Sequence, residues 1–119
     1  MELLNNLKDI AGQIRRLEDE ASVALYELDD KETYTEKLFR KTEILHQLPQ
    51  TCDQEMRDVS PEVQSFIRDR VGGMSFSAGK ALQLNSIFYM SALLYPEGYK
   101  DGDRNDLENF IAGLENLLK

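Results

Sequence analysis

The fold that the sequence predicts is decided by residues 3–28, LLNNLKDIAGQIRRLEDEASVALYEL. Small or apolar residues recur there at alternating spacings of four and three, which is the heptad seam of a coiled coil. No proline interrupts the stretch, so we expect one helix of about 26 residues, roughly 39 Å long at 1.5 Å per residue. The seam consists of Leu3, Leu7, Ile10, Ile14, Leu17, Ala21, Ala24 and Leu28.

Five polar residues, 29–33, interrupt the apolar pattern before it resumes in a new phase at Tyr34. We expect a turn there, with Asp30 or Thr33 as the cap of a second helix that Pro49 ends. One alternative stays open, a single helix running from near Leu3 to Leu48, because no glycine or proline breaks the chain around residue 30.

A third helix is predicted to start at Ser60-Pro61-Glu62, since these residues supply an N-cap, a proline at the first helical position and a first-turn acid. The apolar phase continues across Gly72-Gly73, which favours a continuous or bent helix. Residues 82–95 are apolar nearly all round, so we expect a helix buried on every side. Asn85 within it is either a buried amide or a residue at a polar edge.

A last amphipathic helix is expected to start near Asp103 or Asn105. The pattern as a whole predicts an all-α fold, an antiparallel bundle of about four helices with a long heptad-patterned N-terminal helix. At 119 residues the chain fits one helical domain, residues 1–119.

Composition and charge exclude some classes of partner. The net charge of −8 would repel phosphate backbones and anionic lipid, so we expect neither a nucleic acid nor a membrane partner. The most apolar window, residues 81–95, is too short to cross a bilayer. With one cysteine, Cys52, and no signal peptide at the N-terminus, a cytoplasmic location is expected.

Few residues suggest chemistry, and no linear phosphate-binding, nucleophile or zinc motif is present. His46 is the only histidine, and the acidic neighbours of Cys52 disfavour a reactive thiolate. Residues 101–105 match half of a calcium loop, but Asn105 and Glu108 have the spacing of a helix cap. No cofactor is predicted.

One metal hypothesis uses two acidic pairs, Asp29 with Glu32 and Glu55 with Asp58. Carboxylates three residues apart on two neighbouring helices can hold magnesium, and the pattern is similar to the paired motifs of all-helical nucleotide pyrophosphohydrolases. The match departs from that pattern, because Asp29 replaces a glutamate and both pairs lie in expected connections. A magnesium-dependent enzyme is therefore the alternative function.

The favoured function is a non-enzymatic helical protein–protein interaction module, such as an adaptor, a small regulatory subunit or a chaperone-like holder. The seam of the first helix is longer than a compact bundle would cover, and an exposed apolar stripe is typical of a partner surface. We expect a homodimer, or a larger assembly, through Leu7, Ile10, Ile14 and Leu17. The change Ile14→Glu, which places a charge in the seam, is expected to abolish the binding of a partner protein with the fold retained.

Overall fold

The computed structural model describes residues 2–119, which form six helices and contain no strand. The predicted all-helical class is confirmed, although the helices number six and not about four. Two of the six, α3 and α5, have only six residues each. The helices are α1 (Glu2–Tyr26), α2 (Lys31–His46), α3 (Leu48–Asp53), α4 (Pro61–Leu84), α5 (Ile87–Ala92) and α6 (Asp106–Leu117).

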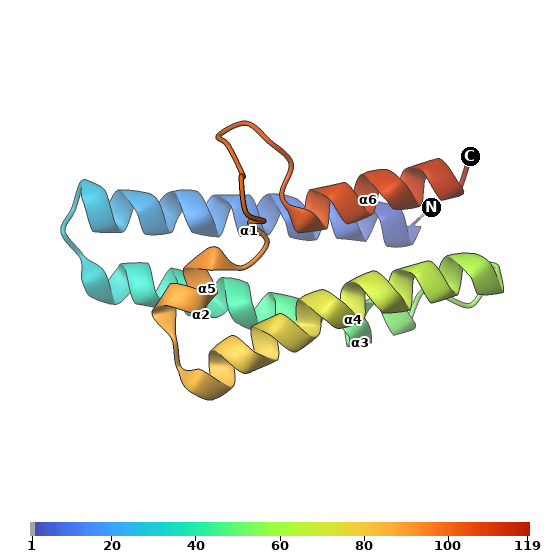
Figure 1. Ribbon diagram of the computed structural model, residues 1–119, viewed down its shortest axis with the longest axis horizontal. Coiled ribbons are helices and arrows are strands. Elements are labelled where there is room, and N and C mark those ends of the chain that lie inside the picture. Colours follow the sequence, from blue (N-terminus) through green and yellow to red (C-terminus); the bar gives the residue numbers. More distant parts are fainter. Residues whose placement is uncertain (1) are drawn as a thin grey trace.

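The α1–α2 turn lies where the polar run predicted it. The alternative prediction, a single continuous helix from near Leu3 to Leu48, is wrong. α1 ends at Tyr26, and Asp29 adopts a positive φ of 50° in the turn. The side chain of Asp30 then accepts hydrogen bonds from the Thr33 backbone N–H at 3.1 Å and from Thr33 Oγ1 at 2.6 Å. This cap starts α2, which runs back along α1 in the opposite direction (Figure 1).

The prediction that Pro49 ends the second helix is wrong. α2 ends three residues earlier, at His46, and Pro49 lies in the first turn of α3. Proline is tolerated at that position because the first amides of a helix have no intrahelical acceptor.

α4 begins as predicted and continues through the paired glycines. Ser60 accepts a hydrogen bond from the Val63 amide at 3.3 Å, and the helix extends over 24 residues to Leu84. It lies beside α2, while α6 lies beside α1 and also contacts α4 (Figure 1).

The prediction of a fully buried helix over residues 82–95 is wrong. Asn85 ends α4 in the left-handed conformation, with φ of 48°, and Ser86 caps α5 by accepting from the Tyr89 amide. The short α5 buries only Met90. Leu84 is 61% exposed and Phe88 is 74% exposed, whereas Met90 and Leu94 are buried. One side of this apolar segment therefore forms surface where the sequence predicted core.

The main core lies between α1, α2, α4 and α6. The face of α1 that packs into it includes several residues of the heptad seam. Leu3, Leu7, Ala11 and Ile14 are buried in this cluster. A smaller cluster of Ala21, Leu38, Ala81 and Met90 lies under α5. The seam is therefore largely used inside the subunit, although Leu28 at its end is 67% exposed.

Candidate functional site

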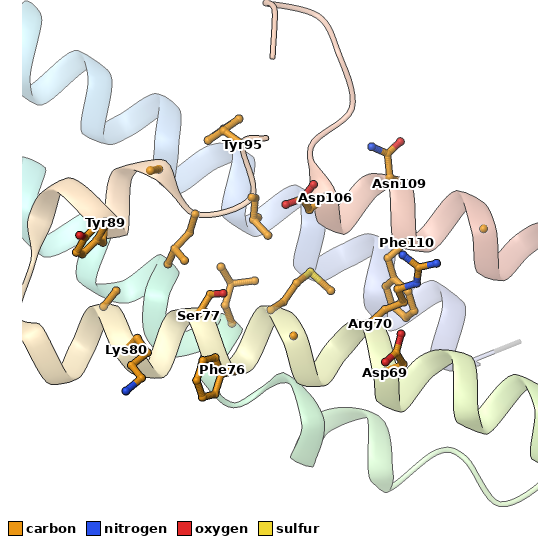
Figure 2. A pocket seen from close by; sticks show the side chains of 18 of the residues that line it. Asp69, Arg70, Phe76, Ser77, Lys80, Tyr89, Tyr95, Asp106, Asn109 and Phe110 are labelled. Carbon is orange, nitrogen blue, oxygen red and sulfur yellow. The ribbon is translucent and has the colours of Figure 1, made fainter. Parts of the chain in front are cut away.

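A large open groove lies between α4, α5 and α6, with a volume of about 1090 Å³ (Figure 2). More than half of its lining residues are exposed, so it is a surface groove and not an enclosed pocket. Its lining consists of Leu45, Phe66, Asp69, Arg70, Gly73, Met74, Phe76, Ser77, Lys80, Ala81, Leu84, Tyr89, Ala92, Leu93, Leu94, Tyr95, Asp106, Asn109, Phe110 and Gly113.

One wall of the groove is a single face of α4. Gly73, Ser77 and Ala81 recur every four residues on this face and line the groove. A Cβ atom added at Gly73 would meet nothing within 4 Å. The wall therefore has room beside it for side chains that this chain does not supply.

One end of the groove closes where α6 meets α4. The rings of Phe66 and Phe110 stack with centroids 5.7 Å apart. A Cβ at Gly113 would lie 3.1 Å from Phe66 Cζ, so glycine is what allows α6 to approach this closely. Figure 2 shows Phe110 and Arg70 reaching toward one another between the two helices.

The other end of the groove carries large apolar side chains that face solvent. We call Leu84, Phe88 and Tyr89 the α4–α5 corner; their exposed fractions are 61%, 74% and 53%. Phe88 and Tyr89 contact one another edge to face at 5.7 Å, and Phe76 on α4 is exposed nearby along the groove. Clustered exposed apolar residues beside a groove are typical of protein interaction sites.

Four charged residues line the groove, two acidic and two basic. Arg70 lies over the Phe66 ring at 5.2 Å and Lys80 over the Phe76 ring at 5.6 Å. Asp69 and Asp106 carry the negative charges, and burial raises the pKa of Asp106 above its ordinary value. The groove is thus locally balanced in charge on a chain of net charge −8.

A buried ion pair positions the segment that follows α5. Lys41, fully buried, places its Nζ 3.0 Å from Glu18 Oε2 and donates a hydrogen bond to the Leu93 carbonyl at 3.0 Å. Its ammonium also lies 5.1 Å from the centre of the Tyr95 ring. Burial lowers the pKa of Lys41 although Glu18 opposes the shift, and burial with Glu18 raises the pKa of Tyr95.

Arg15 fastens the loop between α5 and α6 to α1. Its guanidinium contacts Glu108 Oε1 at 2.6 Å, the Tyr99 hydroxyl at 3.2 Å and the Asp103 carbonyl at 3.1 Å. The hydrogen bond with Glu108 raises the pKa of Arg15, and the same bond lowers the pKa of Glu108. Arg15 and Lys41 together hold the α5–α6 segment on the side of α1, which leaves part of the α4 face uncovered.

The structure divides the predicted interface residues between core and surface. Leu7 and Ile14 are fully buried inside this subunit, whereas Ile10 and Leu17 are partly exposed. A continuous α1 stripe available to a partner is therefore missing, because α2 and α6 already cover two of its four residues.

The four carboxylates of the magnesium hypothesis do not converge. Asp29 and Glu32 lie at the α1–α2 turn, and Glu55 and Asp58 lie in the α3–α4 connection at the opposite end of the long axis (Figure 1). Glu55 instead accepts a hydrogen bond from Asn6 at 2.6 Å. Within residues 2–119, no three or more His, Cys, Asp or Glu side chains gather in an arrangement that could hold a metal ion.

The remaining candidates have structural roles. Asn105 caps α6 and forms a reciprocal capping box with Glu108, as the spacing predicted. Cys52 is buried, which raises its pKa to about 11, with Asp53 and Glu55 contributing. His46 lies on the surface of α2, with Nδ1 3.4 Å from the Ser75 carbonyl.

The fold and the groove define an all-helical protein with an open, partly apolar surface site. No protein-family model, no curated protein and no solved structure matches the chain significantly. Of the helices in residues 2–119, none has the length and apolar character needed to cross a membrane. Sequence patterns missed the groove, and the one local signal for its exposed corner was Asn85-Ser86, a left-handed cap residue followed by an N-cap.

Proposed function

We propose that this protein is a non-enzymatic protein-interaction module that self-associates through the α4–α5 corner and the adjoining groove. In this proposal α1, α2, α4 and α6 serve as an antiparallel four-helix bundle that supports the site. The heptad seam of α1 then acts mainly within the bundle. The cytoplasmic location belongs to the same proposal, since a lone buried cysteine suits a reducing compartment.

The exposure of Leu84, Phe88 and Tyr89 is the observation that carries the proposal. Each fully buried side chain of this size contributes about 1.5–3 kcal/mol relative to exposure, so leaving them in water forgoes substantial stabilisation. A partner surface that covers the corner would recover it. No observation favours the magnesium-dependent alternative, because its four carboxylates lie apart.

The test is sedimentation equilibrium of the wild type and of two variants with the same change in charge. Phe88→Glu places a carboxylate on the corner, and Tyr26→Glu places one on an aromatic residue that is 80% exposed at the end of α1. We expect a wild-type dimer, a monomeric Phe88→Glu protein and a dimeric Tyr26→Glu protein. A wild type that stays monomeric up to about 100 µM contradicts the proposal, because specific homodimers usually form below that concentration.

A further inference from the structure

We propose that α5 is a hinged flap, which opens about Asn85 and Leu94 and is held closed by a hydrogen bond from the buried ammonium of Lys41. The flap carries Phe88 and Tyr89, so its opening takes the α4–α5 corner apart. As a control on self-association the flap rests on the proposed function, while the movement itself rests on the contacts of α5.

Both ends of α5 have a left-handed backbone conformation that residues other than glycine rarely adopt. Within residues 2–119, three such residues have a positive φ, and two of them bracket α5, Asn85 at 48° and Leu94 at 76°. Asparagine tolerates this conformation, whereas a bulky leucine is strained in it and stays there only because its surroundings hold it. The Leu94 side chain is buried in the main core, and Arg15 fastens the loop beyond it. Residues 86–93 can therefore move while the chain on either side stays in place.

Few apolar contacts hold α5 in the closed position. Of its six residues only Met90 is buried, in a socket formed by Ala21 of α1, Leu38 of α2 and Ala81 of α4, with Ile87 packed against the socket's edge. Two of the three socket residues are alanines, which offer Met90 few apolar atoms. A segment with so few buried contacts opens at a lower cost in free energy than the whole chain unfolds.

One buried hydrogen bond closes the flap. Lys41 Nζ donates to the Leu93 carbonyl at 3.0 Å, at the carboxyl end of α5, and lies 3.0 Å from Glu18 Oε2. Since Lys41 is fully buried, opening leaves its ammonium without one of its acceptors. A hydrogen bond from a charged donor is stronger than one between neutral groups, so this contact favours the closed position. Figure 1 shows α5 lying over α2, the helix that carries Lys41.

Thiol labelling measures the opening. Met90→Cys places a thiol beneath the flap and Val71→Cys places one in the main core, while the native buried Cys52 is the internal reference in both proteins. Well below the concentration of the proposed dimer, we expect the thiol at position 90 to react at least about tenfold faster than the thiol at position 71. Low urea should change the rate at position 90 little, because a short flap exposes little surface, and should raise the rate at position 71.

Two ion pairs between α1 and α2 provide matched variants for the closing contact. Lys41→Met with Glu18→Leu removes the pair that holds the Leu93 carbonyl. Lys37→Met with Glu20→Leu removes a more exposed pair, 2.9 Å long, between the same two helices. We expect the first double variant to speed labelling at position 90 at least about fivefold and the second less than about twofold.

The inference is overturned if labelling at position 90 follows labelling at position 71 at every urea concentration, or if the two double variants behave alike. Peroxide oxidation of Met90 in the wild type repeats the urea test without a substitution, and its rate should likewise change little. Sedimentation equilibrium of the wild type keeps the two proposals apart. A monomer removes self-association and leaves the flap, whereas reaction at position 90 only through global unfolding removes the flap and leaves self-association.

Discussion

Lys41 has the largest of the fully buried side chains, and its ammonium joins α1 to the groove. Its partners are the Glu18 carboxylate, the Leu93 carbonyl and the Tyr95 ring. A buried pair adds little net stability over apolar residues of similar volume, but removing one member leaves a charge without compensation. The pair is therefore better understood as a device that fixes where the chain after α5 lies.

Lys41→Met is expected to lower the free energy of unfolding by about 3–5 kcal/mol, because Glu18 remains buried and unpaired. The double variant Lys41→Met with Glu18→Leu should recover most of this loss. Urea unfolding of Lys41→Met, Glu18→Leu and the double variant measures the coupling free energy between the two side chains. If the double variant is as unstable as the sum of the single variants, the two side chains do not act as a pair.

Glu108 gives a prediction for pH. Its hydrogen bond to Arg15 lowers its pKa from the ordinary 4.5, so the bond stabilises the fold above about pH 4.5 and loses its effect as pH falls through the lower folded value. Glu108→Gln keeps a side-chain cap for Asn105 but removes the ion pair. At pH 7 we expect it to be less stable by about 1 kcal/mol, since both side chains are partly exposed.

Urea unfolding at pH 7 and pH 3 tests this dependence. The difference in the free energy of unfolding between wild type and Glu108→Gln should narrow as the pH falls below about 4.5. There the unfolded wild type takes up a proton on Glu108, while the folded protein, whose Glu108 pKa is lower, takes it up only at a lower pH. Glu115→Gln is the control, because the Lys8–Glu115 pair is longer, at 3.6 Å, and more exposed. If Glu108→Gln lowers the free energy of unfolding by the same amount at both pH values, the ion pair with Arg15 does not stabilise the fold.

At the scale of the element, the glycines of α4 differ in what surrounds them. Gly72→Ala is expected to raise the free energy of unfolding by about 0.5–1 kcal/mol, because open space surrounds the new methyl group and alanine favours the helix. At Gly79 the same methyl would lie 3.0 Å from His46 Cε1, so the gain should be smaller or reversed. Thermal or urea unfolding of both variants measures the difference; equal stabilisation would show that His46 moves aside freely.

Local sequence patterns predicted the elements whose ends are set by local bonds. The polar run before Tyr34, the Ser60-Pro61 start and the Asn105–Glu108 cap all correspond to hydrogen bonds within a few residues. The prediction from Pro49 failed because a proline can either follow the end of one helix or lie in the first turn of the next, as it does here in α3.

Apolar composition could not predict whether residues 82–95 lie inside or outside. Burial depends on what packs over a segment, and here Lys41 and Arg15 hold the chain after α5 toward α1. The groove forms where α6 packs near α4 and α5, and more than 20 residues separate the end of α4 from the start of α6, so no local periodicity encodes it. The same reason explains why the heptad seam of α1 did not reveal which of its members the subunit covers itself.

For the whole molecule, the distribution of apolar residues separates what folds the chain from what is left for a partner. α1 contributes Leu3, Leu7 and Ile14 to the core, and each is at most 1% exposed. α5 contributes only Met90 to the interior, while the large side chains of the α4–α5 corner face solvent. An acidic surface of net charge −8 surrounds a groove whose own charges balance.

Because of this distribution, a charge at Ile14 is expected to unfold the subunit and not, as the sequence predicted, to leave the fold intact. Because Ile14 is fully buried, Ile14→Glu should unfold the subunit, at a cost of more than about 4 kcal/mol for an unpaired carboxylate in the core. Phe88→Glu adds the same charge at a side chain that is 74% exposed, so it should keep the helical circular dichroism and the unfolding midpoint of the wild type. If the Ile14→Glu protein folds but no longer dimerises, the dimer interface lies on α1 and not at the α4–α5 corner, since only a surface role for Ile14 explains that result.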